Sequence, residues 1–178
     1  MVAAPLLKPA AALAAPIGDT AVLVFALQAE QLIVYAYELA AASRVISPRV
    51  EPVVNQFLGQ EREHADALAV NIERLSGPLP TPPANLAAFE AGLRALQVDR
   101  STTSLHNERD HLRFLVMVEI ALARAYHFAI EQLSDDKLIQ TSAQIMANEG
   151  QHATILRELI APGDVKRAVP SASVGSGT

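Results

Sequence analysis

Two Glu-x-x-His segments, Glu61–His64 and Glu149–His152, contain the side chains of this chain that are best suited to binding metal ions. On an α-helix three residues advance by about 300°, so the carboxylate and the imidazole lie about 60° apart and can bind one ion from neighbouring turns. Carboxylate and imidazole ligands suit ferrous and ferric iron, with manganese and zinc as lesser candidates. The two segments therefore predict a metal site built between helices.

An internal repeat supplies two more carboxylates. Glu30 is followed seven residues later by Tyr37, and Glu119 is followed seven residues later by Tyr126. These two pairs are 89 residues apart, and the two Glu-x-x-His segments are 88 residues apart. Two helical hairpins related by an approximate two-fold axis would bring all of these residues to one level. The predicted metal ligands are Glu30, Glu61, His64, Glu119, Glu149 and His152.

The surroundings of Glu30 and Glu119 predict that both carboxylates are buried, because they lie in the apolar runs Ala21–Ala29 and Phe114–Ala123. An isolated buried charge loses several kcal/mol of solvation even after the protein relaxes. No lysine or arginine lies on the same helical stripe within about a turn of Glu30. A metal is therefore the expected counter-charge, and four carboxylates neutralise two divalent ions.

A third copy of the motif, Glu108–His111, shows that the motif alone is weak evidence for a metal site. Composition predicts only about 0.3 chance matches in this chain. This copy has no counterpart in the first half of the repeat. We interpret it as a solvated, acidic first turn favoured by the helix dipole, with a second ion site as the less favoured alternative. The other two copies are stronger evidence for a metal site, because the repeat relates them to each other.

Tyr37 and Tyr126 lie within about 20° of the lines of Glu30 and Glu119, two turns further along their helices. Their hydroxyl groups are predicted to hydrogen-bond to carboxylates of the opposite half, although a core tyrosine with any acceptor is a close alternative. The candidate catalytic residues are Glu61, Glu149, Tyr37 and Tyr126. Gly150 costs about 1 kcal/mol relative to alanine inside a helix, and we interpret it as allowing a close helix approach.

Positioning these residues requires four long helices, predicted at about 19–43, 48–75, 104–133 and 136–160. The short joints after the first and third helices make their neighbours antiparallel. The connection 76–103 contains four prolines and a short helix, and it is long enough to cross the bundle. The predicted fold is all-α, a four-helix bundle (19–161) with a long crossover between helices 2 and 3. We expect an extended arm at 1–18 and a flexible tail at 162–178.

Composition narrows the possible partners. The chain has 178 residues, a net charge of −5 and no cysteine. It therefore builds no disulfide, iron–sulfur cluster or thiolate zinc site of its own. The charge and the lack of a Lys/Arg cluster argue against nucleic acid and anionic lipid. The first helix is apolar enough to suggest a membrane span, but Glu30 near its middle favours a buried helix or a homodimer face. A cytoplasmic location is favoured, and the Ala/Pro-rich N-terminus leaves an exported form open.

The pattern of Phe25–Glu30 leading to Tyr37, followed by the remaining repeat residues, resembles the ferritin-like superfamily over about residues 19–160. Within it the chain is similar to bacterial ferritin-like domain proteins related to rubrerythrins and to plant desiccation-related proteins. The resemblance implies that Glu61 and Glu149 bridge two irons. It also implies that Glu30 and Glu119 are terminal carboxylates, and that His64 and His152 each bind one iron. The missing cysteines depart from the rubredoxin-type electron donor of rubrerythrins.

The expected function is that of a di-iron carboxylate protein that oxidises ferrous iron, reduces oxygen or peroxide, or does both. Its partners are then metal ions and oxygen or peroxide. The main alternative is a non-catalytic stress or partner-binding bundle with a structural ion or no ion. An iron-storing cage is a third possibility, which the size of the assembly would separate from the other two.

Overall fold

The computed structural model describes residues 18–99 and 101–169 and consists of helices joined by turns and loops. The long helices are α1 (Asp19–Ala42), α2 (Glu51–Arg74), α4 (Glu108–Gln132) and α5 (Asp136–Ile160). The short ones are α3 (Leu86–Ala95), the 3₁₀ turn η1 (Thr102–Ser104) and α6 (Val165–Ala168). The two described ranges contain no β-strand, and the prediction of an all-α protein is confirmed.

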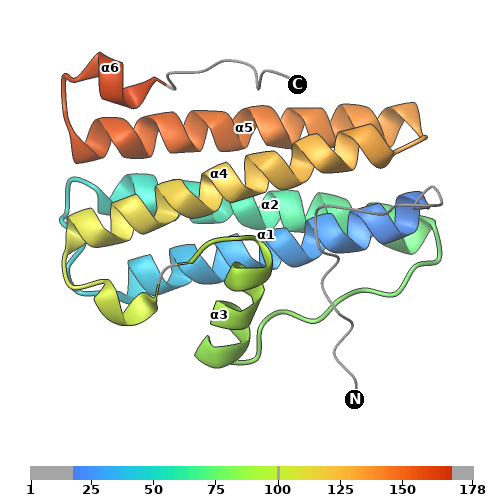
Figure 1. Cartoon of the computed structure of the whole chain (residues 1–178), viewed down its shortest axis with the longest axis horizontal. Coiled ribbons are helices and arrows are strands. Elements are labelled where there is room, and N and C mark those ends of the chain that lie inside the picture. The colour runs from blue at the N-terminus through green and yellow to red at the C-terminus, as the bar shows by residue number, and fades with distance from the viewer. Residues whose placement is uncertain (1–17, 100, 170–178) are drawn as a thin grey trace.

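The long helices form two hairpins that lie against each other (Figure 1). The first hairpin consists of α1 and α2, the second of α4 and α5, and α1 packs along α4. Figure 1 shows the segment between α2 and α4 running back along the bundle, so that α4 begins at the end opposite to that where α2 finishes. This segment contains α3, which packs on α1.

Two apolar clusters fill the interior. One includes Ile33, Phe57 and Leu115, and the other includes Leu23 and Ile72. On α1, α2 and α5 the glutamates of the repeat lie in sequence between residues of one cluster and residues of the other. The predicted site is therefore a polar layer between two apolar ones, held in place by packing on both sides.

The start of α1 lacks a side-chain cap. Gly18 occupies the cap position. The Asp19 carboxylate instead accepts hydrogen bonds from the backbone N–H groups of Ser134 (2.8 Å) and Asp135 (3.1 Å). Asp19 therefore joins the start of the first hairpin to the turn of the second.

The helices α2 and α4 begin later than predicted. The carbonyl of Ser47 accepts the N–H groups of Val50 and Glu51, which forms a separate turn, and α2 begins at Glu51. In the second hairpin the side chain of Asn107 accepts the N–H of Asp110, which fixes the start of α4 at Glu108 rather than at residue 104. A local capping interaction outweighs the continuous apolar pattern in the second case.

Helix α1 is the one described helix that is long and apolar enough to cross a membrane by length and composition. In the structure 61% of its most apolar window is buried. Its outer side is covered by α3, where Tyr35 stacks on Phe89 with ring centroids 4.5 Å apart. A Cβ atom on Gly92 would lie 2.5 Å from Leu32 Cδ2, so α3 approaches α1 through a glycine. Burial on two sides accounts for the apolar composition of α1.

Past α5, residues 165–168 form the short helix α6, and Ala168 is buried. This helix lies within the segment predicted as a flexible tail and packs on α5. The rest of that tail, from residue 170, and residues 1–17 of the predicted arm lie outside the described residues.

Candidate metal centre

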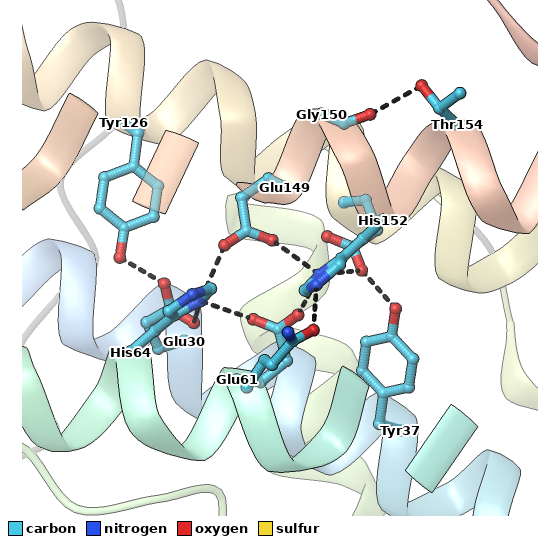
Figure 2. Close-up of polar contacts among 11 residues, drawn as sticks. Glu30, Tyr37, Glu61, His64, Tyr126, Glu149, Gly150, His152 and Thr154 are labelled. Atoms are coloured by element: carbon cyan, nitrogen blue, oxygen red, sulfur yellow. Dashed lines mark hydrogen bonds and ion pairs between the residues drawn. The ribbon is translucent and has the colours of Figure 1, made fainter. Parts of the chain in front are cut away.

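All six predicted ligands meet in the middle of the bundle (Figure 2). They are Glu30 on α1, Glu61 and His64 on α2, Glu119 on α4, and Glu149 and His152 on α5. The four glutamates are completely buried and His152 is 1% exposed. The side chain of His64 is 13% exposed, the largest fraction in the set.

The six side chains form two overlapping groups. One group is Glu30, Glu61, His64 and Glu149, and the other is Glu61, Glu119, Glu149 and His152. Within each group one ligand atom per residue lies within 4.8 Å of every other. Both groups contain Glu61 and Glu149. Each group can therefore hold one ion, and two carboxylates are positioned to contact both.

The two shared glutamates present a different oxygen to each histidine. Nδ1 of His64 lies 3.1 Å from Oε2 of Glu61 and 3.0 Å from Oε1 of Glu149. Nδ1 of His152 lies 2.7 Å from Oε1 of Glu61 and 3.8 Å from Oε2 of Glu149. In both histidines Nδ1 is the nitrogen that faces the carboxylates. This is the arrangement that two ions bridged by two carboxylates require.

Several polar atoms of the cluster are buried and have no hydrogen bond of suitable geometry within residues 18–99 and 101–169. They are Glu30 Oε2, Glu61 Oε1, Glu119 Oε2, both carboxylate oxygens of Glu149, and His152 Nδ1. Leaving a buried polar group unsatisfied costs about 1–3 kcal/mol, and more for a charged one. Five oxygens and one imidazole nitrogen that lie close together without well-formed hydrogen bonds fit a bound cation better than they fit an apolar core.

Each tyrosine of the repeat bonds to the glutamate of the opposite hairpin. The hydroxyl of Tyr37 donates to Oε1 of Glu119, and the hydroxyl of Tyr126 donates to Oε1 of Glu30. This confirms the bonding predicted from the seven-residue spacing. Burial and the neighbouring carboxylates raise the pKa of both phenols, so each keeps its proton and acts as a donor.

Burial also raises the pKa of three of the four carboxyl groups. Desolvation is the largest cause for Glu30, Glu119 and Glu149, and the negative charge of neighbouring carboxylates adds to it. A carboxyl group with a raised pKa retains a proton unless a positive charge replaces it. A divalent cation at the centre would supply that charge to several carboxylates at once.

The pKa values of Glu61 and His64 shift in the direction that favours the charged form of each group. Burial opposes the charged form of Glu61, but the close contacts of its two oxygens with the imidazoles of His64 and His152 lower its pKa. Burial likewise disfavours the imidazolium form of His64, but the close contacts of its ring with the Glu149 and Glu61 carboxylates outweigh burial and raise its pKa to about 11. In the protein without metal, protonated His64 therefore partly takes the place of a cation.

The third motif joins neither group. Oε2 of Glu108 accepts a hydrogen bond from the N–H of Ser47 at 2.6 Å, while His111 is buried, with 6% of its surface exposed. The expectation of a wholly solvated turn is therefore wrong for His111. The imidazole borders a cavity of about 390 Å³ together with Leu39 and Leu105, and burial lowers its pKa.

Gly150 does not have the expected role. It is exposed, and a Cβ atom added to it would meet nothing within 4 Å. The interpretation of Gly150 as a point of close helix approach is therefore wrong. Its carbonyl accepts the hydroxyl of Thr154, as Figure 2 shows on the outer side of α5.

Two residues at the site were not among the predicted ones. Oε1 of Gln60 lies 2.8 Å from Nε2 of His152, and the ring of Phe57 stacks on the same imidazole with centroids 4.0 Å apart. The repeat offset of 88 residues pairs Gln60 with Asn148, another side-chain amide. That pairing was the available indication that this position borders the site.

Paired Glu-x-x-His residues and further glutamates that face the core of a helical bundle are the ligand pattern known from di-iron carboxylate bundles. The family model described as ferritin-like domain matches residues 18–162, and the chain belongs to this family. The fold is similar to the crystal structure of a conserved hypothetical protein from Mycobacterium tuberculosis. The identity is 20% and the TM-score 0.67, over 79% of this chain and 96% of that one. No curated protein matches.

Proposed function

We propose that this chain is a di-iron carboxylate protein that oxidises ferrous iron, reduces oxygen or peroxide, or does both. The four long helices then form a ferritin-like four-helix bundle, with residues 76–103 as its crossover. Iron is the preferred metal, and manganese or zinc can occupy the same ligands. The ferritin-like family membership and the buried cluster of glutamates and histidines support this proposal.

One observation carries the proposal. The two ligand groups share Glu61 and Glu149, and each shared carboxylate presents one oxygen to each histidine. A single structural ion would need only one such group. Two groups with common carboxylates favour two ions at a short separation, which is the arrangement that two-electron chemistry uses.

The position of each glutamate determines whether it contacts one ion or both. Glu61 and Glu149 hold both ions, whereas Glu30 and Glu119 each belong to one group. Each of these two terminal carboxylates has one oxygen bonded by a tyrosine hydroxyl and one oxygen without a hydrogen bond. The tyrosine therefore fixes the carboxylate, and the second oxygen stays free to coordinate. The low exposure of the centre restricts water.

When bound, two iron ions supply one electron each to an oxidant such as oxygen or peroxide. Tyr37 and Tyr126 keep their protons and hold the terminal carboxylates in place, and the protons for the reduced oxidant come from solvent on the side of His64, the most exposed ligand. The carboxylates can change their coordination as the charge on the ions changes, because most of their oxygens are not held by hydrogen bonds.

The test is metal uptake followed by oxidation. The purified protein is titrated with ferrous iron without oxygen, its bound iron is measured, and air or peroxide is then admitted while ferric absorption is followed. We expect two ions per chain and rapid ferric absorption. A double variant, Glu61→Ala with His64→Ala, should bind neither ion. Glu63→Ala, an exposed neighbour on the same helix, is the matched control and should behave as the wild type.

Two results would overturn the proposal. Iron uptake equal to that of the double variant would remove the metal site. Two bound ions without any oxidation by oxygen or peroxide would select the non-catalytic bundle instead. Size-exclusion chromatography separates a many-subunit storage cage from a monomer or from a homodimer formed through α1.

A further inference from the structure

The two ligand groups have unequal surroundings, although each consists of three glutamates and one histidine. His152 is 1% exposed, stacks on Phe57, and has its Nε2 within 2.8 Å of the Gln60 side-chain oxygen. His64 is 13% exposed, and its Nε2 has no hydrogen-bond partner in the described part of the chain. One imidazole is enclosed by protein, and solvent reaches the other.

The internal repeat shows which residues make this difference. The offset of 88 residues pairs Gln60 with Asn148 and Phe57 with Ile145. Asn148 is one methylene shorter than Gln60 and makes no hydrogen bond to His64 or to any other described residue. Ile145 provides no ring to stack on an imidazole. The two side chains that enclose His152 therefore have smaller or non-aromatic equivalents in the His64 half of the repeat.

These contacts affect how firmly an imidazole holds a metal. A ligating histidine normally donates its second N–H to an acceptor, which fixes the ring orientation and makes the ligating nitrogen more basic. Removing such a partner costs about 10- to 100-fold in metal affinity. Gln60 supplies the acceptor for His152 from the facing helix α2, so that Nδ1 of His152 faces the carboxylates. His64 has only solvent for this purpose.

We propose that the two ions are held unequally, with a slowly exchanging ion in the His152 group and an exchangeable ion in the His64 group. Gln60 and Asn148 are the positioning residues that set the difference. The His64 group is then the position through which ions pass between the centre and solvent. This inference rests on the proposed function, because it requires that two ions bind here.

The first experiment measures ion release from the wild-type protein. The protein is loaded with cobalt(II), a redox-stable probe, and excess chelator is added while the visible absorption is followed. We expect two phases of one ion per chain each, with rates that differ by about 10- to 100-fold. A His64→Ala variant should lose the fast phase and keep the slow one. A single phase for two bound ions would overturn the inference and leave the two-ion site standing, whereas no bound cobalt would remove the site itself.

The second experiment exchanges the two amides. Gln60→Asn should speed the slow phase by about tenfold or more, because the shorter side chain no longer reaches His152. Asn148→Gln should slow the fast phase, because it gives His64 the partner that His152 has. The double exchange should reverse or remove the difference. Gln56→Asn, an exposed position one turn earlier on α2, is the matched control. Release rates that are the same in all of these proteins would overturn the roles of Gln60 and Asn148.

A third measurement needs no variant and so does not depend on how well a variant folds. The metal-free wild-type protein is exposed to hydroxyl radicals, whose attack on an imidazole depends mainly on solvent access rather than on a free ring nitrogen, and the oxidised histidines are identified by peptide mass spectrometry. His64 should react before His152, whose ring lies between Phe57 and the carboxylates. Equal reaction rates at the two histidines would contradict the unequal enclosure.

Discussion

The Glu61–His64 and Glu108–His111 segments have the same spacing on their helices and different surroundings. Glu61 is buried and faces both imidazoles of the centre, whereas Glu108 bonds the backbone N–H of Ser47. His64 lies among three carboxylates, and His111 lies beside a small, mainly apolar cavity. A spacing of three residues places two side chains on one helix face. The neighbouring helices decide whether that face becomes a metal site.

Position along the helix explains the difference. Glu61 lies in the middle of α2, where α1, α4 and α5 each bring another glutamate to the same level. Glu108 is the first residue of α4, and its carboxylate accepts the backbone N–H of Ser47 in the segment between α1 and α2. The glutamate of the same motif therefore bonds to loop backbone when it lies at a helix end, and it can bind metal when it lies in the middle of the bundle.

The largest expected effect is that of metal on stability. A ligand that binds only the folded protein at 100 times its dissociation constant stabilises it by about 2.7 kcal/mol per site. Urea unfolding with and without cobalt(II) should show this gain in the wild-type protein and in Glu108→Ala. Glu61→Ala should lose it, because both ligand groups share Glu61. An equal gain in all three proteins would mean that the comparison between the two segments is wrong.

The second effect concerns pH and His111. Burial lowers the pKa of His111, so the unfolded chain takes up a proton at a higher pH than the folded one. Its contribution to stability is therefore full above the ordinary value of 6.5 and is lost as the pH falls from there towards the lowered pKa. The slope is at most about 1.4 kcal/mol per pH unit.

Unfolding of the wild type and of a His111→Leu variant should be compared between pH 7.5 and about 5. The difference between the two proteins isolates His111 from the other titrating groups, and the wild type should lose more stability on acidification. His127→Gln, at an exposed histidine on the same helix, is the matched control for the loss of an imidazole. Parallel pH profiles for wild type and His111→Leu would show that His111 is not held in its neutral form.

A smaller effect is expected at Glu108 itself. Glu108→Ala removes the hydrogen bond to the N–H of Ser47 and should lower the free energy of unfolding by about 1 kcal/mol. Metal stoichiometry should stay that of the wild type. Glu131→Ala, an exposed carboxylate near the other end of α4, serves as the control for the loss of charge. A loss of bound metal in Glu108→Ala would place this segment at the site after all.

The smallest effect separates glycines that serve packing from those that do not. Gly150→Ala and Gly59→Ala meet open space on α5 and α2, and each should stabilise the protein by about 0.5–1 kcal/mol. Gly92→Ala should destabilise it, because the added Cβ would lie 2.5 Å from Leu32 Cδ2. Thermal unfolding of the three variants tests both signs, and a destabilised Gly150→Ala would restore the original interpretation of that residue.

The meeting of the six ligands was predictable because a repeat constrains both halves at once. Matching offsets placed Glu30 and Glu119 at the level of the two motifs, and the seven-residue spacing gave the tyrosine bonds. Each of these depends on helix periodicity, which a sequence shows directly. The helical class followed from the same periodicity.

Features that depend on a single contact were not predictable. The starts of α2 and α4 depend on a turn at Ser47 and a cap at Asn107, which interrupt an otherwise continuous pattern. The burial of His111 depends on which residues close over the first turn of α4. The role of Gln60 depends on the distance to a facing helix, and sequence spacing gives no such distance.

The two tyrosine–glutamate bonds also fix how α1 and α4 slide along each other. On both helices the tyrosine follows the glutamate by seven residues, and the helices run in opposite directions, so one alignment satisfies both bonds together. A shift of one helical turn, about 5.4 Å, would break both and leave two phenols and two carboxylates without partners in the core. The pair of bonds therefore favours one register between α1 and α4 and disfavours any misaligned packing of the two hairpins.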